Sequence, residues 1–319
     1  MVVASPNPIR SESVRVIELP VIDLSAERSK VSSLIVQACE QYGFFQVINH
    51  GISEDTIARM EQQGLSFFTK PVCEKQRAGP ATPFGYGRKN IGFNGDVGEV
   101  EYLLLDTNPL SISQGSYSFS NDPKMFSSAV SGYMEAVKGL ACEILDQMAE
   151  GLRVHDSSVF SRMIRAVESD SIFRLNHYPP ILCKDKVGFG EHTDPQILTI
   201  LRSNGVPGLQ ISPGDGLWVP VPPHPTAFCV NVGDALQAMT NGRFMSVRHR
   251  ALANSHKPRM SMAYFGAPPL HAWLTPPPEL VTPHKPLLYR PFTWGEFKST
   301  LYSLRLGDSR LHLFKTFNS

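Results

Sequence analysis

The sequence predicts an α+β protein with a double-stranded β-helix, or jelly-roll barrel, between a helical N-terminal region and a C-terminal helix. Two patterns along the 319 residues support this prediction. In the first half, apolar residues recur at helical spacing, whereas from about residue 172 short β-branched and aromatic runs alternate with glycine and proline. The 26 prolines interrupt the second half too often for long helices. Such short, evenly spaced strands are typical of a sandwich or barrel.

The N-terminal region is expected to start with a helix, a strand and a second helix. Residues 27–41 place their apolar side chains on one helix face, and Gly43 then ends the pattern. The run 44–48 is aromatic and β-branched, as strands are. Ser53 is a favourable N-cap for the second helix, which must end before Pro71.

A longer helix is expected from Asp122, with Pro123 in its first turn, to about Gly151. Short strands then follow. We expect them at residues 172–178, 197–202, 208–211, 217–221, 227–232, 247–253 and 260–265. An amphipathic helix near residues 293–304 ends the chain.

These elements suggest five regions along the chain. They are a flexible tail (1–15), an N-terminal region (16–121), the long helix with its connector (122–170), the barrel core (171–270) and a C-terminal extension with its helix (271–319).

Composition excludes several functional classes. The formal net charge is +1, so no overall field favours nucleic acid or a membrane surface. The first fifteen residues lack the apolar stretch that a secretory signal needs, and the sequence contains no apolar run of membrane length. Its five cysteines are widely spaced and form no CxxC pair, which favours reduced thiols. We therefore expect a cytoplasmic protein with a small-molecule partner; composition leaves self-association open.

Three residues are candidate metal ligands. The segment GEHTDP (190–195) places His192 and Asp194 two positions apart, so at a strand end both side chains face one side. A capped turn is the simpler explanation of this pair alone. In SVRHRA (246–251), alternation turns His249 inward and both arginines outward. Two imidazoles and one carboxylate on one face are the ligand set of non-haem Fe(II) oxygenases.

Arg259 and Ser261 share a strand face by the same alternation. A buried arginine requires an anion, either an internal carboxylate or a bound one. A dicarboxylate cosubstrate fits the second case, because Fe(II), Asp194, a 2-oxo acid dianion and Arg259 together carry no net charge.

Four motifs together resemble the plant 2-oxoglutarate- and Fe(II)-dependent dioxygenase superfamily: HTD (192–194), SVRH (246–249), RMS (259–261) and NHYPP (176–180). The resemblance implies Fe(II) as cofactor, 2-oxoglutarate as cosubstrate and ascorbate as reductant. The implied roles are iron ligation by His192, Asp194 and His249, and binding of the distal carboxylate of 2-oxoglutarate by Arg259, Ser261 and Tyr178.

The segment FGYGRKNIGFNGDVGEVEYLLL (84–105) resembles the gibberellin 2-oxidases, which inactivate plant growth hormones by hydroxylating carbon 2. Its glycine spacing does not fit a dinucleotide loop, and we expect a glycine-rich loop before a short strand. The resemblance implies O2-dependent 2-beta-hydroxylation of gibberellins with release of succinate and CO2. Candidate substrate contacts are Tyr86, Arg88, Asn94, Tyr102 and Phe265. Arg88 or Lys89 is the expected partner of the gibberellin carboxylate, and a solvated loop charge is the alternative.

Three other functions remain open at this point. One is a related oxygenase that acts on a flavonoid or on carbon 3 of gibberellins. Another is a zinc hydrolase that uses the same three ligands, although it gives Arg259 no role. The third is a gibberellin-binding protein without catalysis.

Overall fold

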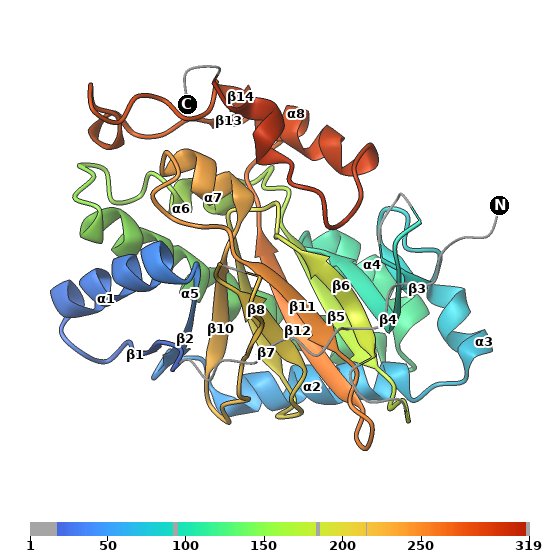
Figure 1. Cartoon of the computed structure of the whole chain (residues 1–319). Coiled ribbons are helices and arrows are strands. Elements are labelled where there is room, and N and C mark those ends of the chain that lie inside the picture. The colour runs from blue at the N-terminus through green and yellow to red at the C-terminus, as the bar shows by residue number, and fades with distance from the viewer. Residues whose placement is uncertain (1–17, 92–94, 183–185, 215, 317–319) are drawn as a thin grey trace.

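The structure of the protein is a computed structural model that describes residues 18–91, 95–182, 186–214 and 216–316. The expected tail, residues 1–15, and the candidate Asn94 lie outside the described residues. Two sheets face each other as a distorted barrel, with the N-terminal helices packed along its larger sheet (Figure 1).

The larger sheet has eight strands. In spatial order they are β1 (Val21–Asp23), β2 (Phe44–Ile48), β10 (Phe228–Val232), β7 (Leu198–Ser203), β12 (Arg259–Gly266), β5 (Ile172–Tyr178), β4 (Val97–Asp106) and β3 (Gly85–Asn90). The smaller sheet consists of β6 (Val187–His192), β11 (Arg248–Leu252), β8 (Leu209–Ser212) and β9 (Val219–Pro220). A short pair, β13 (Trp273–Leu274) and β14 (Phe292–Thr293), lies beyond the barrel.

Within the described residues, the first half of the chain forms five α-helices. They are α1 (Arg28–Gln41), α2 (Glu54–Phe68), α3 (Val72–Lys75), α4 (Pro109–Phe119) and α5 (Pro123–Gly151). The Ser53 side chain accepts a hydrogen bond from the Thr56 amide, so the predicted cap of α2 is confirmed. The long helix begins at the expected place, where the Asp122 side chain accepts a hydrogen bond from the Met125 amide. The second half adds α6 (Ser161–Arg165), α7 (Asp234–Met239) and α8 (Trp294–Ser299).

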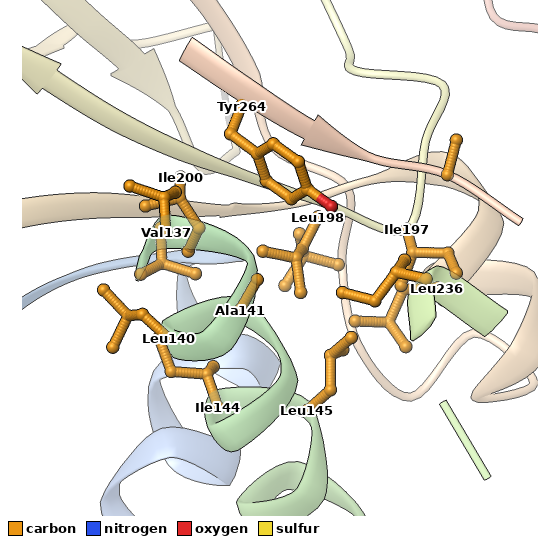
Figure 2. Close-up of a cluster of buried hydrophobic side chains, with 14 of the residues drawn as sticks. Val137, Leu140, Ala141, Ile144, Leu145, Ile197, Leu198, Ile200, Leu236 and Tyr264 are labelled. Atoms are coloured by element: carbon orange, nitrogen blue, oxygen red, sulfur yellow. The ribbon is translucent and has the colours of Figure 1, made fainter. Parts of the chain in front are cut away.

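The main core lies between α5 and the outer face of the larger sheet. Figure 2 shows side chains of α5 interleaved with residues on and beside β7 and with Tyr264 of β12. The members that α5 contributes there are Val137, Leu140, Ala141, Ile144 and Leu145, all buried. This packing fixes the larger sheet and leaves its other face to line the barrel.

The pairing of β12 with β5 and β7 determines which side chains line the barrel. Met260, Met262 and Tyr264 face the helices and belong to the main core. The alternate residues of β12, which begin with Arg259 and Ser261, therefore face the interior. The predicted alternation of this strand is confirmed.

Several elements differ from the sequence prediction. The seven expected strands are all present within two residues of their expected ends, but β6 was not expected as a strand. The glycine-rich segment forms strand β3, not a loop, and pairs with a β4 of ten residues. Helix α4 was missed because its serines and Gly115 have weak helix propensity; Asn108 caps it. The C-terminal helix is shorter than expected, since α8 continues as a single turn at residues 300–302.

Candidate active site

Three elements bring His192, Asp194 and His249 together inside the barrel. His192 ends β6 and pairs directly with His249 of β11, while Asp194 lies in the loop that follows β6. The Nε2 atoms of His192 and His249 lie 3.6 and 3.5 Å from Oδ1 of Asp194. One potential ligand atom from each residue lies within 4.8 Å of the other two. This donor set suits a divalent metal ion.

Hydrogen bonds orient each of the three side chains toward their common point. Nδ1 of His192 donates to the Gly190 carbonyl at 2.8 Å, and Nδ1 of His249 donates to the Val247 carbonyl at 3.2 Å. Because the carbonyls only accept, both protons sit on Nδ1 and both Nε2 lone pairs face Asp194. In the neutral form of each ring, Nε2 is therefore the nitrogen that can bind a metal.

The two carboxylate oxygens of Asp194 have different contacts. Oδ2 accepts hydrogen bonds from Thr199 Oγ1 at 2.6 Å and from Asn231 Nδ2 at 3.3 Å. Oδ1 faces the two imidazoles. One oxygen is thus anchored by β7 and β10, and the other is presented to the centre.

The electrostatics of the cluster favour a neutral His192 and an ionised Asp194. Burial, together with the adjacent His249, lowers the pKa of His192 well below its ordinary value. Burial raises the pKa of Asp194, but the neighbouring imidazoles and its hydrogen bonds outweigh this effect, so the net pKa lies below the usual value. Neutral imidazoles beside an ionised carboxylate are the forms that ligate metals.

The loop that carries Asp194 is held by residues that the sequence did not single out. The Asp234 amide donates to the Asp194 carbonyl at 2.7 Å, and Thr193 Oγ1 donates to Asp234 Oδ2 at 3.2 Å. Arg310, from the C-terminal segment, lies 3.7 Å from Asp234 and contacts the Thr193 carbonyl at 3.5 Å. No sequence motif marks Arg310, because only the tertiary fold brings it to this loop.

A second polar group lies deeper in the barrel. Arg259 is 2% exposed; its Nη1 donates to Ser261 Oγ at 3.4 Å, and its guanidinium carbon lies 5.2 Å from the Tyr178 ring centroid. Its Nε is buried and finds no hydrogen-bond partner among the described residues. Within that part of the chain, no carboxylate forms an ion pair with it. A buried cation with an unused donor fits a bound anion better than an internal pair.

The five candidate substrate residues do not share one location. Tyr102 pairs with Asn176 of β5 and Phe265 pairs with Thr199 of β7, so both lie on the interior face. Tyr86 faces the helices instead: its ring packs against Phe67, and its hydroxyl donates to Glu101 at 2.7 Å. A strand reverses side at each residue, which puts Tyr86 in the helix-side core rather than beside the triad.

Arg88 is exposed and pairs with Glu101, whose side chain also faces the helices. Glu191 points away from the triad, as alternation predicts, and its carboxylate lies 3.1 Å from Arg248 at the surface. Neither side chain reaches the interior of the barrel.

Comparison with known proteins identifies two matching family models. Residues 169–268 match the 2OG-Fe(II) oxygenase superfamily, and residues 19–108 match the N-terminal region of the non-haem dioxygenases in morphine synthesis. Together they include the three clustered ligands, Arg259 and the β3–β4 hairpin.

Similar plant proteins cover nearly the whole chain. "Gibberellin 2-beta-dioxygenase 4" of Arabidopsis thaliana is 56% identical over 315 residues, which cover 94% of this chain and 95% of that protein. "Gibberellin 2-beta-dioxygenase 1" of Pisum sativum is 51% identical and covers 92% of this chain and 89% of its own. A rice protein of the same description is 45% identical, with 94% and 87% covered.

Solved structures share the fold. JOX2 in complex with 2OG, Fe and JA matches with a TM-score of 0.83 at 28% identity, covering 95% of this chain and 90% of that one. The rice dioxygenase for auxin oxidation matches with a TM-score of 0.80 at 27% identity, covering 94% and 100%. These matches confirm the predicted α+β barrel with N-terminal helices.

Proposed function

The chain belongs to the gibberellin 2-beta-dioxygenase group of the 2OG-Fe(II) oxygenase superfamily, and we propose that its barrel carries out this reaction with iron held by His192, Asp194 and His249. The enzyme hydroxylates gibberellins at carbon 2, with 2-oxoglutarate as cosubstrate. The observation that carries the assignment of ligands is the convergence of two Nε2 atoms on one free carboxylate oxygen.

When bound there, Fe(II) supplies O2 activation coupled to decarboxylation of 2-oxoglutarate, which yields succinate, CO2 and the hydroxylated substrate. The protein fixes the positions of the three side chains that would bind the iron. The carbonyls of Gly190 and Val247 hold the imidazoles, and Thr199 holds the carboxylate. A cluster held in this way loses little freedom when a metal binds.

We propose that Arg259, Ser261 and Tyr178 bind the distal carboxylate of 2-oxoglutarate. Three features support this role: Arg259 is buried, its Nε has no partner among the described residues, and all three side chains converge within β5 and β12. Burial raises the pKa of Tyr178, so its hydroxyl stays protonated and can donate a hydrogen bond to a carboxylate.

Gibberellins are rigid apolar polycycles that carry a carboxylate, so their pocket needs apolar walls and a few placed polar groups. Tyr102 and Phe265 remain our proposed wall residues because both line the interior. Tyr86 faces the helices and Arg88 is exposed, so we propose neither as a substrate contact.

The zinc-hydrolase alternative finds no support in this arrangement. It requires a general base beside the metal, and Glu191 is paired with Arg248 at the surface instead. It also leaves the buried Arg259 without a function.

The test is aerobic incubation with Fe(II), 2-oxoglutarate and a panel of gibberellins, with products read by mass. We expect one oxygen atom to be added per succinate formed, and no turnover in His249→Ala. Turnover without added metal, or without O2, would contradict the proposal. Hydroxylation at carbon 3, or of a flavonoid alone, would assign the chain to a related oxygenase.

Three further expectations accompany this function. We propose that ascorbate serves as the reductant that maintains ferrous iron, which omission of ascorbate from a multiple-turnover assay tests. We also propose a cytoplasmic location, which fluorescence microscopy of a tagged chain tests. Separately, none of the helices in the described residues has the length and hydropathy of a membrane span. Light scattering of the purified chain decides whether it self-associates.

A further inference from the structure

A second arginine, Arg174 of β5, lies inside the barrel and takes no part in the site described so far. Its cross-strand neighbours are Ala263 of β12 and Leu104 of β4. Ala263 lies on the interior face of β12, two residues after Ser261, so Arg174 faces the interior as well. It therefore lies at a level between Arg259 and the triad.

The guanidinium of Arg174 is held in place by aromatic rings. Its central carbon lies 3.9 Å from the Tyr102 ring centroid and 5.0 Å from that of Phe189. The Phe189 ring in turn lies 4.7 Å from the His192 ring, so one aromatic side chain separates Arg174 from a metal ligand. Arg174 also interacts electrostatically with Asp194.

Gly87 of β3 allows this stack to form. A Cβ at that position would lie 2.3 Å from the Tyr102 ring. Because Gly87 has no Cβ, the Tyr102 ring can occupy this space beside β3 while Arg174 lies over the ring.

The hydrogen bonding of Arg174 is incomplete. Nε donates to the neutral amide oxygen of Asn176 at 2.8 Å, but Nη2 is buried without a partner among the described residues. Burial lowers the pKa of Arg174, because a buried charge is poorly solvated. Aromatic stacking offsets only part of that cost, so an anion should occupy the open donor.

The sum of the charges around the triad predicts one further anion. Fe(II), Asp194, the 2-oxoglutarate dianion and Arg259 together are neutral. Arg174 adds one positive charge, which a monocarboxylate neutralises. A gibberellin brings such a group, and 2-oxoglutarate already has Arg259 for its distal end.

We propose that Arg174, stacked on Tyr102, binds the carboxylate of the gibberellin and so orients the polycycle toward the metal. This inference rests on the proposed function. It replaces the exposed Arg88 as the partner of that carboxylate, because Arg88 does not reach the interior.

The test is anaerobic calorimetry of the Fe(II)- and 2-oxoglutarate-loaded enzyme with one gibberellin and with its methyl ester. We expect Arg174→Gln to weaken binding of the free acid about 10- to 100-fold, the range for a hydrogen bond to a charged group. The ester should bind wild type and variant alike, and Arg174→Lys should recover part of the affinity for the acid.

Arg250 provides a matched control. Its guanidinium carbon lies 3.9 Å from the Trp218 ring centroid, and its Nε donates to Gln210 at 2.8 Å, but its strand alternation turns it away from the triad. Arg250→Gln should leave the affinity for the free acid within about twofold of wild type.

Three results would overturn the inference. The first is free-acid binding by Arg174→Gln within about threefold of wild type. The second is an equal loss of 2-oxoglutarate affinity, which would assign Arg174 to the cosubstrate. The third is a lowered unfolding temperature of the ligand-free variant with affinity lost for acid and ester alike, which would make the role structural.

Product analysis of wild type in the same samples separates the two proposals. If wild type forms no hydroxylated gibberellin, the proposed function fails and this inference with it. If wild type hydroxylates gibberellin while Arg174→Gln binds the acid normally, only the role of Arg174 fails.

Discussion

Replacing Thr199 with valine should weaken metal binding at the triad while leaving the fold intact. Thr199 is 1% exposed, and its hydroxyl donates a 2.6 Å hydrogen bond to Oδ2 of Asp194. Valine keeps the shape of the side chain and removes only this donor. Because Asn231 still holds the same oxygen at 3.3 Å, the carboxylate is loosened rather than released.

The expected magnitude follows from the kind of bond that is lost. A hydrogen bond to a charged group contributes about 1.5–3 kcal/mol, and loss of such supporting contacts typically lowers metal affinity about 10- to 100-fold. Anaerobic titration with Fe(II), or with Mn(II) as an O2-stable probe, measures the change directly. Thermal unfolding without metal should differ little from wild type.

Thr240 offers a matched control for this substitution. It is also 1% exposed, and from the C-cap position of α7 its hydroxyl donates to the Leu236 carbonyl at 2.8 Å. Thr240→Val should therefore change stability without changing metal affinity. The reasoning is refuted if Thr199→Val binds metal as wild type does, or if both variants lose affinity equally.

Other substitutions test the remaining parts of the account. Arg259→Gln should raise the KM for 2-oxoglutarate about 10- to 100-fold with little change for gibberellin, as steady-state kinetics would show. Glu101→Gln should destabilise the protein by about 3 kcal/mol, measured by urea unfolding, because Glu101 is buried in an ion pair with Lys75 at 2.7 Å. Burial raises the pKa of Glu101, but hydrogen bonds from His177, Lys75 and Tyr86 outweigh it and lower the pKa from 4.5 to about 2. The stabilisation by Glu101 is therefore complete above about pH 5 and is lost as the pH falls toward 2. Val137→Ala, within the α5 core, should cost about 2–3 kcal/mol in the same urea assay without changing KM.

Local signals account for the parts of the fold that the sequence predicted well. Ser53 caps α2 as expected, and α5 begins at Asp122 as expected, because a side-chain oxygen next to free amides needs no tertiary partner. Strand alternation placed His249 inward and Arg259 beside Ser261 for a similarly local reason. Alternation alone does not indicate what these residues bind. The four sequence motifs indicated iron and 2-oxoglutarate.

The missed features depend on tertiary contacts. Strand β6 contains two glycines and has weak strand propensity, yet pairing with β11 makes it a strand and sets His192 opposite His249. The face of Tyr86 depends on the register of β3 against β4, which spacing alone does not fix. Arg174 could be identified as a candidate binding residue only from the structure, in which its Nη2 has no partner among the described residues.

Oxygen-isotope labelling tests the central claim most directly. With Fe(II), 2-oxoglutarate and a gibberellin under 18O2, we expect one labelled atom in the new hydroxyl at carbon 2 and one in succinate. Label that enters the product from water instead, or product that forms equally without O2, would contradict an oxygenase reaction at the His192, Asp194 and His249 cluster.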